Sequence, residues 1–374
     1  MIKYISSSMK GLSKLDDSFG SLVRELKKTL VEGFNTNTIT EVSHGTETTL
    51  TLGMGHGFAK DQVVVLPGGK EAKVLKATED TITIAKTEVT TGEIKAATLG
   101  FSIVHSEGNT VIFKSKKHYL KIVDEPPYPE YDNKYMKFAR AYASSLFDGK
   151  DLVSAPFVCW DYLTVYSTPG GHERDYPLEK KQPRDWYLVG DEHTFYLIVD
   201  SIGYNTQYSI YSFGSNSKGL LVLVGSQRPL ITKSFKPNTG NRYGSVWNCG
   251  LADTRFTAGC FIVSDRDGYP TNTLFRPVSY HLPREQFKDI PSWAKVTSYV
   301  RGKLLAFKVN IEILGGSFGG YLRGLHHVYS LQLPTNSRVG SLMAVSTHTK
   351  YNESFGVVTL YIDLNDWELP HENT

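Results

Sequence analysis

The most informative hydrophobic pattern lies near the middle of the chain, where two apolar runs flank a short polar turn. Trp186–Val189 forms the first run, Phe195–Val199 forms the second, and Gly190-Asp-Glu-His193 lies between them. Tight turns require residues such as glycine and aspartate, so the stretch predicts a β-hairpin. Alternate positions on both faces of each run are apolar, which is typical of strands covered on two sides. We therefore expect this hairpin to be central to the fold.

Near the N-terminus, apolar residues recur at steps of three and four, which predicts an amphipathic helix of about five turns. The stripe consists of Leu12, Leu15, Phe19, Leu22, Val23, Leu26 and Leu30. We expect Gly33 to end the helix, because a glycine just past the last turn can adopt a left-handed conformation. So much apolar surface must pack either on the chain's own β-module or on a neighbouring subunit. Leu22, Leu26 and Leu30 are the candidate interface residues.

Residues 36–115 change to threonine-rich alternation, which predicts a small β-barrel or sandwich. The expected strands include 49–52, 63–66, 74–75, 81–84 and 111–113. An acidic, proline-rich link follows at 124–130, where neither regular helix nor central strand is expected. Beyond it, Tyr135–Leu146 again steps by three and four, which predicts a second, shorter helix.

From residue 151 onward strands dominate, and the first of them carries an aromatic ladder. Trp160, Tyr162 and Tyr166 fall on one face of the predicted strand. Such a ladder could stack sugars, and it fits a packed interior or a subunit interface at least as well. Further strands are expected at 208–213, 220–224, 305–313 and 358–364.

Composition narrows the class of protein without naming a ligand. The 374 residues contain 41 Lys+Arg and 38 Asp+Glu, and the formal charge of +3 indicates neither a nucleic-acid partner nor an anionic membrane. Cys159, Cys249 and Cys260 form no Cys-x-x-Cys pair, so we expect reduced structural thiols rather than disulfides or zinc ligands. No signal peptide or membrane span is expected, so the protein is predicted to stay in the cytoplasm of the cell that makes it.

Candidate catalytic chemistry is weak. A polysaccharide hydrolase needs two carboxylates in one cleft, and Asp185 with Asp191, or Asp265 with Asp267, are the available pairs. Aspartate beside glycine is more typical of turns, so we interpret these residues as turn residues. His56 is expected in a turn or core rather than as a metal ligand. Gly315–Gly320 resembles a phosphate-binding loop, but no amphipathic helix follows, so we expect a flexible turn. The sequence predicts no enzyme, cofactor or metal site.

A resemblance rests on the central stretch. Arg184-x-Trp186, a hydrophobic run ending in Gly190-Asp191, and the following Phe195-Tyr196 resemble a group of structural proteins of tailed-bacteriophage virions. The similarity extends over most of the chain, including the helix at 20–34. It also includes the landmarks Gly268-Tyr-Pro270, Pro277-Val-Ser-Tyr280 and Arg301-Gly302. The group usually continues there with a Pro-Gly turn, whereas this chain has Lys303-Leu-Leu305.

The resemblance implies a virion protein that forms an oligomeric ring or collar in the tail, baseplate or neck. Its expected partners are copies of itself and other virion proteins, without nucleic acid or membrane. The alternative is a receptor- or glycan-binding tail-tip module that uses the ladder at 160–166. The expected fold is mainly β, with several small antiparallel sandwiches or barrels, an N-terminal helix and one further short helix. The expected domains are 1–34, 35–120, 121–150 and 151–374, the last with a division near 295.

Overall fold

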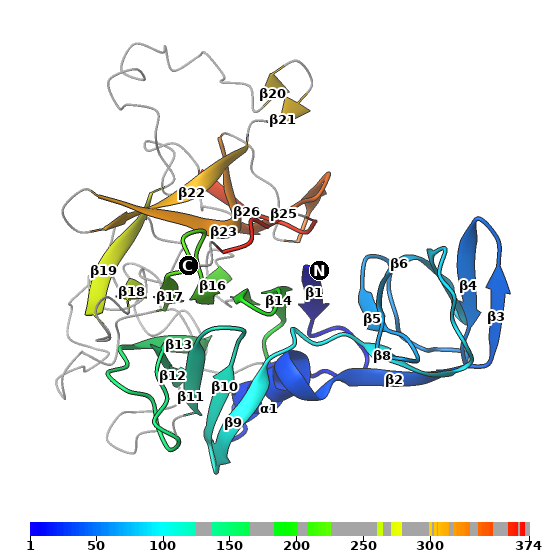
Figure 1. Ribbon diagram of the computed structural model, residues 1–374, viewed down its shortest axis with the longest axis horizontal. Helices are drawn as coiled ribbons and strands as arrows, with labels where there is room; N and C mark the ends of the chain where they lie inside the picture. Colours follow the sequence, from blue (N-terminus) through cyan, green and yellow to red (C-terminus); the bar gives the residue numbers. More distant parts are fainter. Residues whose placement is uncertain are drawn as a thin grey trace, which may run out of the picture.

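A computed structural model describes most of the chain and shows a mainly β protein (Figure 1). Among the described residues, strands dominate and helical residues are confined to the segment 21–32. The expected fold class is therefore confirmed. The described residues are 1–124, 136–164, 183–200, 208–225, 260–264, 271–278, 299–300, 303–304, 306–313, 317–329, 336–346, 358–365 and 367–370.

The predicted central hairpin is present. Strand β14 (Trp186–Gly190) pairs antiparallel with β15 (Thr194–Asp200), and Trp186 lies opposite Val199. Asp191 forms the turn, because its Oδ1 accepts the backbone N–H groups of His193 at 2.9 Å and Thr194 at 3.0 Å. Such a side-chain acceptor fixes the backbone in a turn conformation.

Both faces of this hairpin are buried, as its two-sided apolar pattern predicts. One face belongs to a core with α1 and the neighbouring sheets, and includes Trp186, Leu188, Phe195, Leu197 and Val199. The other face belongs to a second core with the C-terminal strands, and includes Val189, Tyr196 and Ile198. The hairpin is therefore a wall shared by two cores.

A twelve-stranded antiparallel sheet contains the hairpin. Its order is β1-β14-β15-β16-β17-β18-β19-β22-β23-β26-β25-β24. The other strands are β1 (Lys3–Ser6), β16 (Tyr208–Ser215), β17 (Leu221–Val224), β18 (Cys260–Ser264), β19 (Thr271–Val278), β22 (Ala306–Ile313), β23 (Ser317–Tyr329), β24 (Arg338–Val339), β25 (Leu342–Ser346) and β26 (Val358–Asp363). The strands expected near 208, 220, 305 and 358 are therefore confirmed.

The two ends of this sheet approach each other through side chains. Tyr4 on the first strand donates a hydrogen bond to Asn336 Oδ1 at 2.9 Å, and the guanidinium of Arg338 lies 5.3 Å from the centroid of the Tyr4 ring. A separate two-stranded ribbon is formed by β20 (Tyr299–Val300) and β21 (Lys303–Leu304).

Residues 34–96 form a seven-stranded sheet, at the right in Figure 1, as the threonine-rich alternation predicts. Its order is β2-β8-β5-β6-β7-β4-β3. The strands are β2 (Phe34–Ile39), β3 (Glu41–His44), β4 (Glu47–Thr51), β5 (Val63–Val65), β6 (Glu71–Ala77), β7 (Thr81–Ala85) and β8 (Gly92–Ala96). The strand expected at 111–113 belongs to a different sheet.

That different sheet has five strands in the order β13-β12-β11-β10-β9. They are β9 (Ser102–Glu107), β10 (Thr110–Lys114), β11 (Tyr119–Asp124), β12 (Met136–Ser144) and β13 (Phe157–Thr164). The sheet draws strands from three of the four expected domains, and the domain division stays a prediction.

The predicted second helix is wrong, because β12 occupies its place. Ala139, Ala141 and Ala143 are buried while Arg140 and Tyr142 between them are half-buried, which is the period of a strand. A stretch with so many apolar residues fits both periods. Pairing with β11, in which Ala141 lies opposite Ile122, selects the strand.

The N-terminal helix exists but is shorter than predicted. Helix α1 (Ser21–Lys27) continues into one π-helical segment, η1 (Lys28–Glu32), and ends at Gly33, whose φ is 93°. It begins after Gly20, whose left-handed φ of 76° interrupts the stripe. The expected first half, from Leu12 to Phe19, instead lies in the non-helical segment 7–20 that follows β1, and Phe19 is 58% exposed. Among the described residues, no helix has the length and apolarity needed to cross a bilayer.

Candidate functional site

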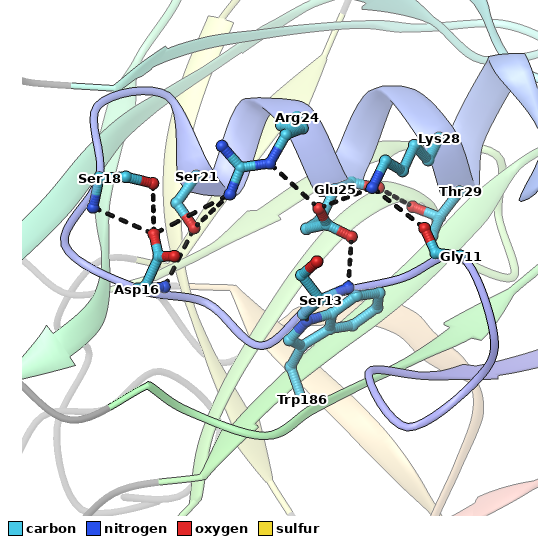
Figure 2. Close-up of polar contacts among 10 residues, drawn as sticks. All are labelled: Gly11, Ser13, Asp16, Ser18, Ser21, Arg24, Glu25, Lys28, Thr29 and Trp186. Atoms are coloured by element: carbon cyan, nitrogen blue, oxygen red, sulfur yellow. Dashed lines mark hydrogen bonds and ion pairs between the residues drawn. The ribbon is translucent and has the colours of Figure 1, made fainter.

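The segment between β1 and α1 is held from two sides at Ser13 (Figure 2). The Ser13 N–H donates to Glu25 Oε2 at 3.0 Å, and the Ser13 carbonyl accepts Trp186 Nε1 at 2.9 Å. Glu25 lies on α1 and is buried, whereas Trp186 begins the central hairpin. These bonds hold the segment between helix and hairpin, which explains why it does not continue the helix.

One cation of α1 and one of η1 complete the surroundings of the buried Glu25 carboxylate. Lys28 Nζ donates to Glu25 Oε1 at 3.1 Å and to the Gly11 carbonyl at 3.0 Å, and Arg24 Nε lies 3.3 Å from the same Oε1. A buried carboxylate requires such partners, because burying an unpaired charge is costly. Both oxygens of Glu25 are engaged, so the cluster attaches α1 to the rest of the chain.

A second buried ion pair lies at the turn of the central hairpin. Arg323 of β23 donates to Asp191 through Nη1 to Oδ1 at 3.1 Å and through Nη2 to Oδ2 at 2.7 Å. The exposed fraction of the side chain is 0% for Arg323 and 9% for Asp191. Burial alone would raise the pKa of Asp191, but the hydrogen bonds and charge of Arg323 outweigh it and lower that pKa.

Aromatic and backbone groups enclose the Arg323 side of this pair. Tyr196 donates its hydroxyl to the Arg323 carbonyl at 2.9 Å, and the Arg323 guanidinium lies 5.5 Å from the Trp367 ring centroid. Arg323 Nε also donates to the Glu368 carbonyl. The pair therefore joins the hairpin turn, β23 and the segment around Trp367.

The sequence analysis missed Arg323 because it took the preceding glycines as a flexible turn. The structure corrects this for residues 317–320, which begin β23, while 315 and 316 lie outside the described residues. Gly320 has a φ of 103°, and a side chain there would crowd Asn216 and Ser217. The available signal was an arginine within the apolar and glycine-rich run 318–325, since buried arginine requires an anionic partner.

The expected interface residues of the helix belong to the chain's own core. The exposed fractions are 1% for Leu22, 2% for Leu26 and 0% for Leu30. Leu22 and Leu26 surround one small gap together with Leu15, Trp186 and Leu197, and Leu30 belongs to the same core on the α1 side of the hairpin. The expectation that they present a surface to a neighbour is therefore corrected, because the chain itself covers them.

The aromatic ladder is likewise interior where the structure describes it. Trp160 is 0% exposed, stacks on Tyr211 at 5.7 Å and donates Nε1 to the Val224 carbonyl at 3.0 Å. Tyr162 is 1% exposed and donates its hydroxyl to Asp124 Oδ1 at 2.6 Å. Burial, and then the Asp124 charge, raise the pKa of the Tyr162 hydroxyl. Tyr166 lies outside the described residues.

Asp185 and Asp191, the first pair considered for hydrolysis, do not face one cleft. Asp185 and Asp191 lie at opposite ends of β14, about 20 Å apart at ~3.3 Å per strand residue, whereas glycosidases separate the two groups by at most about 10 Å. Asp185 instead accepts the Ser7 hydroxyl at 2.9 Å and Lys14 Nζ at 2.7 Å. Asp265 and Asp267 lie outside the described residues.

His56 is a buried turn residue, as predicted. Its Nδ1 accepts the Phe58 N–H at 2.9 Å, and its exposed fraction is 1%. Within the part of the chain that the structure describes, no group of three His, Cys, Asp or Glu side chains could hold a metal ion. Cys249 is outside that part, and the side chains of Cys159 and Cys260 are not described.

No protein-family model and no curated protein matches this chain.

Proposed function

We propose that the protein is a structural component of a tailed-phage virion, where it assembles through protein–protein contacts into an oligomeric ring or collar of the tail, baseplate or neck. The observation that carries the proposal is the position of the resembling motif. Trp186, Gly190-Asp191 and Phe195-Tyr196 build the hairpin that both cores share, and Asp191 holds it to β23. The residues of the resemblance are thus those on which the architecture depends.

The polar clusters favour a scaffold as well. The Glu25 and Asp191 carboxylates each bind groups of the same chain, so both carboxylates join elements of the fold. Strands β3 and β9 lie at the edges of their sheets, and most of their residues are exposed or half-buried. Edge strands carry backbone groups that can pair with another chain.

In the alternative of a glycan-binding tail-tip module, two of the three proposed binding residues are buried. Trp160 and Tyr162 are enclosed by β16, β17 and Asp124, and a sugar cannot stack on them without opening the core. We therefore retain the structural role.

The test is to detect the protein in particles. Tailed particles would be purified by density gradient from a lysogen that carries the gene, and the protein quantified by mass spectrometry against the major capsid protein. We expect a small integral number of copies per particle, with antibody label at the tail, baseplate or neck. A lysogen with the gene deleted serves as the control for antibody specificity. Absence of the protein from infectious particles would overturn the proposal.

A further inference from the structure

The outer face of the five-stranded sheet carries aromatic side chains that the core does not use. In this sheet, Leu120, Ile122, Ala141, Ala143, Val158 and Trp160 point inward and are buried. The alternate positions point outward, and there Tyr119, Tyr142 and Phe157 are only half-buried. A sheet with one wet face normally places polar residues there, so these rings require another explanation.

The rings are organised into two pairs with lysines beside them. Tyr119 stacks on Phe147 at 5.5 Å, and Tyr142 lies 5.3 Å from Phe157. Lys114 Nζ lies 5.6 Å from the centroid of Tyr119, and Lys121 Nζ lies 5.7 Å from that of Tyr142. Lys121 and Tyr142 are direct cross-strand partners, so the two pairs form one continuous surface.

Exposed aliphatic residues extend this surface at the connection between β12 and β13. Leu146 is 38% exposed and Val153 is 36% exposed, and the Val153 N–H donates to the Leu146 carbonyl at 3.2 Å. Phe147 and Leu152 are paired in the same connection. The connection is therefore a compact apolar projection beside the rings, held in shape by its own backbone.

The charge around the surface is positive. The lysines beside the rings and in the connection are Lys114, Lys121 and Lys150, and the acidic residues there are Asp148 and Asp151. Both acidic residues have partners in the chain. Asp148 accepts the N–H of Lys150 at 2.8 Å, and Asp151 pairs with Lys121 at 2.7 Å. An incoming anionic group thus meets the ammonium groups of Lys114 and Lys150, whereas both carboxylates are already engaged.

We propose that this face, defined by Tyr119, Tyr142, Phe147, Phe157, Leu146 and Val153, binds an acidic peptide segment of a partner protein that contains an apolar anchor. Aromatic residues are enriched at the centres of protein interfaces, where apolar anchors supply affinity, and charges around them contribute specificity. A sugar would need an open aromatic face, whereas each tyrosine ring already contacts a second ring and an ammonium group. The identification of the partner as a neighbouring virion protein rests on the proposed function. The binding surface itself is argued from the structure alone.

The experiment uses the purified full chain, so it is independent of particle composition. A yeast-displayed library of random twelve-residue peptides would be sorted for binding to the fluorescently labelled chain. We expect the enriched peptides to combine two or more acidic residues with Leu, Phe or Trp. Their affinity should fall at least tenfold for Lys114→Glu/Lys150→Glu and for Leu146→Ser/Val153→Ser. A matched control, Lys70→Glu/Met54→Ser, changes exposed residues in two connections of the seven-stranded sheet and should alter affinity less than twofold.

The variants change exposed residues, and melting temperatures within a few degrees of wild type would show that they fold. A library that yields no enriched peptide, basic peptides, or peptides that bind all variants equally would overturn the proposal. So would face-dependent binding on a glycan array. A second library of overlapping peptides from the chain's own sequence tests a copy of itself as the partner, and face-dependent binding there would replace the partner we name. Detection in particles could still fail or succeed independently.

Discussion

Arg323 and Asp191 form a two-bond ion pair at 3.1 and 2.7 Å inside the protein, 132 residues apart in the sequence. The pair ties the turn of the central hairpin to the C-terminal strands, and Arg323 Nη1 also donates to Thr194 Oγ1 at 3.0 Å. Because both side chains are buried, neither can find water if its partner is lost.

We expect Asp191→Asn to destabilise the protein by about 3–5 kcal/mol, because it leaves the Arg323 charge buried and unpaired. The asparagine oxygen can still accept the N–H groups of the turn, so the loss of stability measures the ion pair rather than the turn. The double variant Asp191→Asn/Arg323→Met should lose less stability than the single one. Urea denaturation measures these differences. Glu47→Gln, which removes an exposed pair with Lys76, is the control and should cost less than about 1 kcal/mol. Equal losses for Asp191→Asn and the control would contradict the prediction.

A pH dependence is expected from His118, which is buried among β10, β11 and their turn. Burial, and then the charge of Lys117, lower the pKa of His118 to about 3 from its usual 6.5. Between these values the unfolded chain binds a proton that the folded chain does not, so stability falls as pH falls. From pH 7 to pH 5 this group should remove roughly 2 kcal/mol, since each pH unit is worth about 1.4 kcal/mol.

Urea midpoints at pH 7 and pH 5 measure this loss. His118→Gln should make the difference between the two pH values smaller, whereas His44→Gln, at an exposed position of β3, should leave it unchanged. A wild-type protein that is equally stable at both pH values would count against a buried neutral imidazole.

The helix residues give a prediction about folding rather than assembly. Leu26→Ala should cost about 2–5 kcal/mol in the isolated chain, because it leaves a cavity against Leu15, Trp186 and Leu197. Phe19→Ala, at a position 58% exposed just before α1, should change stability by less than about 0.5 kcal/mol. Thermal denaturation of the monomer separates the two. If Leu26→Ala leaves the melting temperature unchanged but impairs assembly, the interface role that we corrected would be restored.

Gly324→Ala should displace Trp367. Gly324 has a φ of 67°, and a Cβ there would collide with the indole of Trp367. The indole packs beside Tyr196 at 5.6 Å and over Arg323. We expect a loss of stability well above that of Gly68→Ala, which has a similar φ of 85° but open space around it. Tryptophan emission should shift to longer wavelength in the Gly324 variant alone, and an unchanged spectrum would be the contrary result.

The local sequence pattern was sufficient to predict an element where it fitted only one of the two periods, that of a strand or that of a helix. At Trp186–Val199 both faces were apolar and glycine and aspartate stood between the runs, so hairpin, position and turn residue followed from the sequence. At Met136–Ser144 the alanines fitted both periods, and pairing with β11 made the choice. At Leu12–Phe19 the helical period was present, but the segment is held out of the helix by hydrogen bonds from Ser13 to Glu25 and Trp186. The local period cannot reveal these contacts, because Trp186 is distant in the sequence and Glu25 lies within the predicted helix.

The candidate sites show the same limit. Asp191 was correctly interpreted as a turn residue, yet its partner Arg323 could not be found, since the pairing depends on the strand order of the whole sheet. The aromatic ladder drew attention to Trp160 and Tyr162, whereas Tyr119, Tyr142 and Phe157 are the half-buried rings on the outer face of the same sheet. Alternation defines two faces of a strand, but only the neighbouring elements decide which face is inside.

The pairing of β1 with β14 has a consequence for the timing of synthesis. Ser6 lies opposite Tyr187, so roughly 180 residues separate the two strands, and at a translation rate of about 5–20 residues per second β1 waits roughly 10–35 s for its partner. During that interval Ile5, which is 2% exposed in the finished protein, has no sheet to enter. The sheet is therefore completed at this edge by a strand that the ribosome released long before, and chaperone occupancy of nascent chains should be greatest before β14 and β15 emerge.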